Sequence, residues 1–140
     1  MEAVKANFER LGAAEGIRVR LNSHQCSSRL ALEGAKYAEN KGKFTDYHRM
    51  VFQAQFVEDR DIVDMDVLAD IAGKAELDQD DFRACLAERR MKPMVDADVA
   101  EAARLGVTAV PAFIFNDGAE VIVGAQPLES FRQLLKMLRE

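Results

Sequence analysis

The sequence predicts a mostly helical α/β fold in one domain of 140 residues. Apolar residues recur at helical spacing through most of residues 1–105. The run Val110–Phe115 is instead β-branched and aromatic, which is typical of a strand, and the tight-turn signal Asn116-Asp117-Gly118 follows it directly. We therefore expect helices over about residues 1–105, then a β-hairpin and a final helix over about residues 106–140.

The composition excludes several classes of protein. With 49% hydrophobic and 31% charged residues, the chain is typical of a globular protein rather than a disordered or fibrous one. Its net charge is -5 and it has no long run of Lys or Arg, which argues against binding to nucleic acid or to an anionic membrane. The cluster Arg89-Arg90-Met91-Lys92 is short, and we interpret it as a solvated helix C-terminus.

About six helices are expected before the hairpin, from apolar spacing and capping residues. They cover approximately residues 3–14, 27–40, 44–56, 64–72, 77–89 and 94–105. The first presents one buried stripe, formed by Val4, Phe8, Leu11 and Ala14. Ser27 or Ser28 should cap the second helix, and Asp64 or Asp66 the fourth. Between the first two helices, Gly16–Leu21 alternates apolar and charged residues, so it is either a strand or an extended linker.

The C-terminal segment is predicted as strand, turn, strand and helix. We expect Val110–Phe115 to be a buried strand, Glu120–Val123 to pair with it, and Pro127 to begin the last helix. A two-stranded hairpin is marginal in water and this one is apolar, so its edge should be covered. The cover is expected to be Ile17–Leu21, a second copy of the chain or exchanged strands. If a second copy or exchanged strands cover the edge, the chain forms a homodimer or self-associates in another way through the hairpin edge.

The segment that leads into the hairpin is the most specific motif of the sequence. It reads Gly106-Val107-Thr108-Ala109-Val110-Pro111-Ala112-Phe113-Ile114-Phe115-Asn116, and Val123-Gly124-Ala125-Gln126 follows before the last helix. This pattern resembles the C-terminal end of the thioredoxin superfamily. More narrowly, it is similar to the cytoplasmic branch of the DsbA family, which includes FrnE-like oxidoreductases and relatives of 2-hydroxychromene-2-carboxylate isomerase. The stretches that begin at Ser28, Phe44, Asp61 and Val67 look like that family's helical insertion, in the same order.

The resemblance implies a partial thioredoxin-like fold. Residues 1–105 would form a large helical insertion, and residues 106–140 the C-terminal strand, strand and helix of the thioredoxin fold. In that superfamily the proline before the hairpin is cis, and the residue before it faces the redox cysteines and can bond an extended substrate. By resemblance these residues are Pro111 and Val110. The implied activity is thiol–disulfide exchange on extended peptides or protein thiols, with no cofactor.

The sequence departs from this family at the redox centre. In full-length relatives a strand, a Cys-x-x-Cys motif, its helix and a further strand precede the first segment seen here, and the 140 residues contain no Cys-x-x-Cys. No catalytic residue can be transferred, and we expect a truncated or degenerate form of the oxidoreductase. Two alternatives stay open: a non-catalytic module that binds peptides or proteins, and a glutathione-dependent isomerase-like protein.

The two cysteines could supply other chemistry. Cys26 precedes a helix N-terminus and follows His24 closely, and such surroundings can lower the pKa of a thiol. Cys26 is therefore a candidate reactive thiol. The alternative is that it is simply a small residue in a loop beside the helix cap. Cys85 lies on the apolar stripe of its helix and is interpreted as a small buried hydrophobe. His24 and His48 are too few to build a metal site with the cysteines, so no metal site is expected.

The N-terminus predicts the compartment. Met1–Lys5 leads directly into a charged amphipathic pattern, without a secretory signal, and no stretch of the sequence is long enough to span a bilayer. We expect a cytoplasmic protein with no membrane partner. A reducing compartment disfavours a structural disulfide between Cys26 and Cys85.

Overall fold

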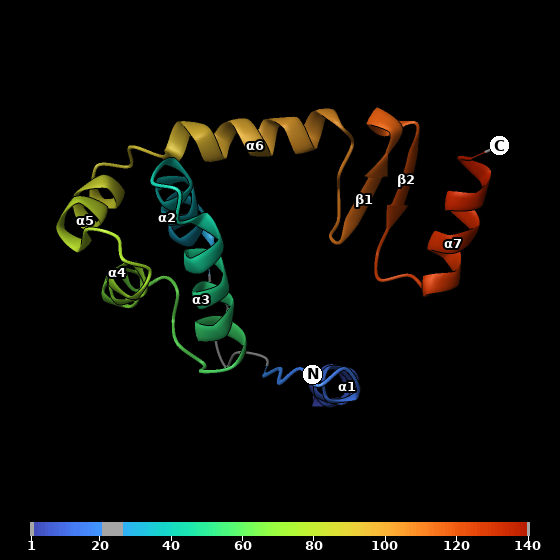
Figure 1. Ribbon diagram of the computed structural model, residues 1–140, viewed down its shortest axis with the longest axis horizontal. Coiled ribbons are helices and arrows are strands. Elements are labelled where there is room, and N and C mark those ends of the chain that lie inside the picture. The colour runs from blue at the N-terminus through green and yellow to red at the C-terminus, as the bar shows by residue number, and fades with distance from the viewer. Residues whose placement is uncertain (1, 21–26, 140) are drawn as a thin grey trace. The chain divides into compact units, whose positions relative to one another are not determined.

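The computed structural model describes residues 2–20 and 27–139. They fall into two compact units, which we call the helical unit (Met1–Asp96) and the hairpin unit (Ala97–Glu140) (Figure 1). The elements are α1 (Glu2–Ala14), α2 (Arg29–Asn40), α3 (Phe44–Phe56), α4 (Met65–Lys74), α5 (Gln79–Ala87), α6 (Lys92–Arg104), β1 (Ala112–Phe115), the 3-10 turn η1 (Asn116–Gly118), β2 (Glu120–Val123) and α7 (Leu128–Met137). Among these residues no helix is both long enough and apolar enough to cross a membrane.

The helix boundaries follow the predicted capping signals in part. α3 spans the predicted residues, and Asp64 caps α4 by accepting a hydrogen bond from the N–H of Asp66 at 2.8 Å. Ser28 occupies the N-cap position of α2, but its side chain makes no capping hydrogen bond. The hydroxyl of Ser27 instead accepts a long hydrogen bond from the N–H of Arg29, at 3.4 Å.

The buried stripe predicted for α1 is wrong. Phe8 and Leu11 are 50% and 49% exposed, because α1 packs against no other helix or strand in the described part of the chain. The segment after it, Ile17–Arg20, forms no strand, which leaves the extended-linker alternative for those residues. The backbone N–H of Arg20 donates to the carbonyl of Phe56, at 2.6 Å.

The core of the helical unit lies between α2, α3, α4 and α5, and Figure 1 shows α2 and α3 side by side. Its largest fully buried side chains are Tyr47, Phe82, Leu68, Ile71, Leu86, Glu33 and Cys85. Helix α2 lies close to the rings of Tyr47 and Phe82 because Gly34 has no side chain. A Cβ there would lie 2.8 Å from Cζ of Tyr47 and 2.9 Å from Cζ of Phe82.

One carboxylate is buried in this core. Glu33 is fully buried, and Arg89 donates to it from Nε to Oε2 at 2.9 Å and from Nη2 to Oε1 at 2.6 Å. Arg89 follows α5 in a left-handed conformation, with φ of 56°. Arg29 also reaches Glu33, at 3.6 Å, and forms an ion pair with Asp96 on α6. Arg89 is exposed directly after the end of α5, as the interpretation of a solvated helix C-terminus expects, and it also serves a buried partner that the sequence did not indicate.

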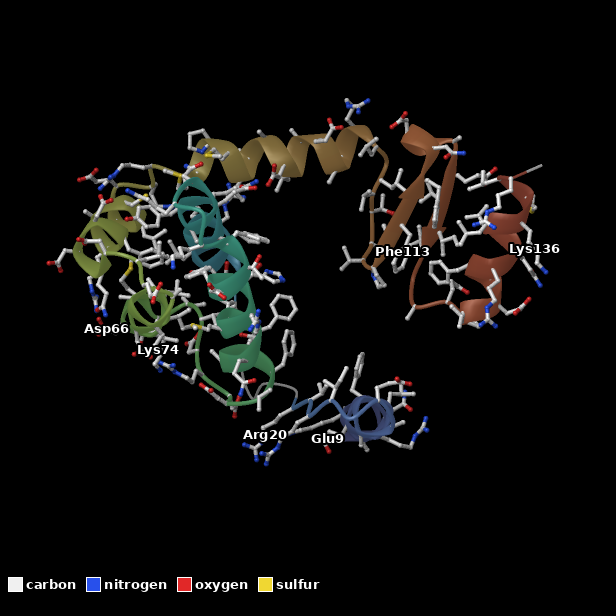
Figure 2. All side chains as sticks on the ribbon, viewed as in Figure 1. Glu9, Arg20, Asp66, Lys74, Phe113 and Lys136 are labelled. Atoms are coloured by element: carbon white, nitrogen blue, oxygen red, sulfur yellow. The ribbon has the colours of Figure 1, made fainter. Side chains whose placement is uncertain are left out.

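The hairpin unit is a two-stranded antiparallel ribbon with one helix against it. β1 pairs with β2 so that Ala112 lies opposite Val123. Phe113 points from β1 toward α7, where its ring meets that of Phe131 edge-on with 4.8 Å between centroids (Figure 2). Helix α7 therefore packs on the face of the ribbon that carries Phe113.

The prediction of a buried strand over Val110–Phe115 is wrong in two respects. β1 begins two residues later, and Phe113 and Ile114 are 40% and 36% exposed. The described residues form a sheet of two strands, and α7 packs on one face of it. Because strand side chains alternate, Ile114 lies on the opposite face together with Val121 and Val123, which are each nearly half exposed.

We expect Gly34→Ala to destabilise the protein. Overpacking of a core costs about 1–3 kcal/mol, whereas alanine gains back at most about 1 kcal/mol in helix propensity. The free energy of unfolding, measured by urea titration, should therefore fall by roughly 1 kcal/mol or more. Adding Tyr47→Phe, which removes the nearest clashing oxygen, should restore part of the loss. Equal or higher stability of Gly34→Ala alone would show that α2 does not press on this aromatic pair.

Candidate functional site

The start of the hairpin places Val110 and Pro111 at the surface of the hairpin unit. The peptide bond between them is cis, and Val110 is 85% exposed. The carbonyl of Pro111 accepts a hydrogen bond from the N–H of Gly124 at 2.7 Å, so this residue is held to the chain beyond β2. Backbone groups alternate in an antiparallel ladder, so the N–H and C=O of Ala112 and Ile114 point away from β2. Beside the exposed Val110, β1 thus offers an open backbone edge within the hairpin unit.

A second candidate site is an apolar groove between α2 and α3, which we call the α2–α3 groove. It has a volume of about 330 Å³. Its lining residues come from the two helices and the loop that follows α3: Ser28, Ala31, Leu32, Ala35, Tyr47, His48, Val51, Phe52, Gln55, Phe56 and Ile62. All of them belong to the helical unit.

The aromatic side of the groove is a row of rings one helical turn apart on α3. His48 stacks on Phe44 with centroids 5.1 Å apart, and the ring of His48 also meets that of Phe52, at 4.6 Å between centroids. Phe52 in turn meets Phe56 at 5.5 Å. The spacing of four residues is visible in the sequence, and it could have indicated an aromatic stripe. The sequence predicted helix α3 but not the groove, because Ala31 and Ala35, whose small side chains leave the space, lie on another helix, α2.

The groove has few polar atoms. Burial raises the pKa of the Tyr47 hydroxyl well above its ordinary value, so this phenol is neutral, and it donates a long hydrogen bond to the carbonyl of Ala31 at 3.5 Å. Gln55 Oε1 is buried and has no hydrogen-bond partner among the described residues.

The described cysteine is shielded from solvent. Cys85 is fully buried on α5 beside Phe82 and Leu86, as the sequence predicted, and burial raises the pKa of its thiol. A raised pKa and an inaccessible sulfur both oppose nucleophilic attack at neutral pH. The candidate reactive thiol Cys26 and its neighbour His24 lie outside the described residues.

Acidic side chains near α5 have structural partners. Asp78 caps α5 by accepting from the N–H of Asp81, at 2.8 Å. The hydroxyl of Tyr37 and the guanidinium of Arg90 donate to Asp81 and lower its pKa, while burial and Asp81 together raise the pKa of Tyr37 to about 12. Within residues 2–20 and 27–139, no three His, Cys, Asp or Glu side chains are arranged to hold a metal ion.

The chain consists of a helical unit, then a hairpin that is preceded by a cis-proline, then a helix packed on that hairpin. This order is that of a thioredoxin-like protein with a large helical part. Comparison with known proteins identifies the family. The sequence model of the DsbA-like thioredoxin domain matches residues 1–136, and the chain therefore belongs to that family. The expected thioredoxin-like fold, mostly helical with a small sheet, is confirmed.

Two relatives illustrate the relationship. The chain is 35% identical over 107 residues to YwbO, an uncharacterized protein of Bacillus subtilis, with 76% of this chain and 52% of that protein covered. Its structure is similar to the crystal structure of a probable DsbA oxidoreductase from Streptomyces coelicolor, at a TM-score of 0.83 and 32% identity. That match covers 96% of this chain and 58% of the other. The chain thus spans about half the length of these relatives.

We expect Cys85 to resist alkylation in the folded protein. Because its thiol pKa is raised, the thiolate fraction at pH 8 is smaller than that of a free thiol, and the rise of the rate with pH should begin at a higher pH. Mass spectrometry after timed treatment with iodoacetamide should show modification at least about tenfold slower than in guanidinium. The Cys26→Ser variant isolates the signal of Cys85. Equal rates in the folded and unfolded states would contradict the burial of this thiol.

Proposed function

We propose that these 140 residues form the substrate-holding part of a DsbA-type thiol–disulfide oxidoreductase, without the redox cysteine pair. Membership of the DsbA-like family carries the proposal, and the similar structure of a probable DsbA oxidoreductase supports the same reaction class. The motif around Val110-Pro111 further suggests the branch that contains FrnE-like proteins. The substrate would be an extended peptide segment that bears a thiol or a disulfide.

The hairpin offers a means of holding such a substrate. Val110 is exposed, and the backbone N–H and C=O of Ala112 and Ile114 point away from β2. An extended chain can pair with such groups as an added strand, which binds backbone without demanding a particular sequence. We propose that the substrate backbone bonds Val110, beside Pro111, in this manner.

The burial of Cys85 and its separation from Cys26 in the sequence support the proposal that this segment contains no redox pair. Disulfide exchange requires an accessible thiolate to attack a sulfur and a second thiol to resolve the mixed disulfide. Cys85 is fully buried with a raised pKa, and Cys26 lies far from it in the sequence. We infer that the 140 residues do not complete a redox cycle by themselves.

A non-catalytic peptide-binding module is the second candidate function, and the burial of Cys85 favours it. The two candidates share the hairpin site and differ only in whether a redox pair elsewhere in the protein acts on the bound peptide. Extending the sequence upstream and measuring insulin reduction by the longer protein separates them. Reduction would support the oxidoreductase, whereas an inactive longer protein that still binds peptide would support the module.

We expect the 140-residue chain to leave insulin reduction by dithiothreitol at its uncatalysed rate, while still binding an extended peptide. A fluorescein-labelled peptide with one alkylated cysteine reports binding through its anisotropy. Val110→Pro removes a backbone donor and should weaken binding about two- to tenfold, the value of one hydrogen bond. Val110→Ala keeps the donor and is the matched control. Catalysed reduction of insulin that Cys26→Ser abolishes would contradict the proposal and would identify Cys26 as the active thiol.

We further propose that the chain self-associates through the hairpin. The face that carries Ile114, Val121 and Val123 is apolar and about half exposed, and the β1 edge is unpaired in the described residues. Sedimentation velocity should show a concentration-dependent shift from monomer to dimer, which Ile114→Lys should abolish. Gln133→Lys, which adds the same charge on an exposed position of α7, should not. A protein that stays monomeric at high concentration would refute self-association.

A further inference from the structure

The outer edge of β2, like that of β1, carries backbone groups that point away from the ribbon. The N–H of Gly124 donates to the carbonyl of Pro111, and hydrogen-bonded pairs alternate with non-bonded pairs along an antiparallel ladder. Counting back from Gly124 along β2, Val123 and Val121 belong to the non-bonded pairs. Their N–H and C=O groups therefore face outward, so each strand of the hairpin has two residues of this kind.

One of the outward groups on β2 is occupied from within the chain. The side-chain amide of Gln126 donates from Nε2 to the carbonyl of Val123, at 3.1 Å. On β1 the outward residues are Ala112 and Ile114, and among the described residues no hydrogen bond from outside the ribbon reaches their carbonyls. The two edges of the hairpin are thus different: the β1 edge is open, and the β2 edge is partly occupied.

The turn after β2 places Gln126 beside the strand. Gly124 has a φ of 85°, a left-handed conformation that favours glycine, and the chain turns there directly after β2. A Cβ on Gly124 would lie 3.7 Å from Nε2 of Gln126, which shows that the amide lies back against this turn. Pro127 then restricts the backbone at the start of α7. The backbone on either side of Gln126 is therefore restricted, which lowers the entropy cost of holding its side chain at Val123.

Helix α7 does not close the β2 edge. Between β2 and α7 the hairpin unit has a hollow of about 460 Å³, and Leu134 and Met137 of α7 make part of its wall apolar. An added strand can place a side chain in this hollow. Glu120 adds a charge to β2, whereas Val110–Phe115 contains none, and charged residues on an edge strand oppose pairing. The occupied carbonyl of β2 and its charge, rather than a lack of space, therefore restrain pairing at this edge.

From these observations we infer that Gln126 determines which edge of the hairpin accepts an extended chain, because it occupies the Val123 carbonyl and leaves β1 as the accepting edge. The inference rests on the proposed function, since it concerns the same hairpin. A strand that pairs with β2 must displace the Gln126 amide, and the loss of one hydrogen bond changes an affinity about two- to tenfold. Because β2 has four residues, of which two face outward, this one bond is a large part of what pairing there can gain.

The same difference between the edges limits the self-association proposed for the chain. Two copies that pair β1 to β1 about a twofold axis form a closed dimer. If β2 also accepted a strand, each dimer would keep two accepting edges, and its growth would not close. We expect Gln126 to stop the assembly at the dimer.

Amide exchange measured by NMR on the full chain distinguishes the two edges residue by residue. The same alkylated peptide, added in excess, should slow exchange at the outward N–H groups of β1, on Ala112 and Ile114, but not at those of β2. In Gln126→Met, which keeps a long side chain without the donor, the outward N–H groups of β2 should be slowed as well. Gln133→Met makes the same change at an exposed position of α7 beside the same hollow, and it should behave as the wild type.

Two further measurements support the assignment. Gln126→Ala should give the same exchange pattern as Gln126→Met, which separates the loss of the donor from the gain of an apolar side chain. In sedimentation velocity, the wild type and Gln133→Met should not exceed the dimer, whereas Gln126→Met should form larger species as its concentration rises.

The outcomes separate this inference from the proposed function. Slowed exchange at the β2 edge of the wild type, or an unchanged β2 edge in both Gln126 variants, would overturn the role of Gln126. Wild-type species larger than a dimer would overturn it too. Slowed exchange at β2 in Gln126→Met, without any at β1 in the wild type, would instead refute the proposed peptide site on β1 and support the role of Gln126.

Discussion

The buried carboxylate of Glu33 is the constraint on which the helical unit depends. A charge without water must have a hydrogen-bonded counterion, and here Arg89 supplies two donors from the end of α5. Arg89 reaches that position only because the chain leaves α5 in a left-handed conformation and then turns into α6. Arg29 extends the charges from Glu33 to Asp96 on α6. One buried charge thus couples α2, the end of α5 and the start of α6.

The hairpin unit depends on a weaker set of interactions. Its two strands hold each other through backbone hydrogen bonds, and α7 covers one face through Phe113 and Phe131. The other face and the β1 edge lie open in the described residues. Open edges and apolar faces favour association with another chain or segment. Under the function proposed above, the same open edge would hold an extended peptide.

The two candidate sites differ in the chemistry that they can perform. The hairpin presents backbone groups, which recognise an extended chain but provide no nucleophile. The α2–α3 groove presents aromatic rings and apolar side chains instead of an open backbone edge. The cysteine that the structure describes takes part in neither site, because its sulfur is packed in the core. We propose that the described residues bind a peptide, and family membership is what connects them to disulfide exchange.

Local patterns in the sequence were sufficient to predict much of this protein. The bounds of α3, the position of β2 and the Asp64 cap all depend on neighbours within a few residues, where helical spacing and turn chemistry act. The Val110-Pro111 motif indicated the family by its resemblance to a known pattern. Only the tertiary structure decided which apolar faces are covered, as on α1 and β1, because coverage depends on elements distant in the chain. It also decided the partner of Glu33 and the existence of the α2–α3 groove, since no sequence spacing shows that Arg89 would approach Glu33 or that two alanines would face a row of rings.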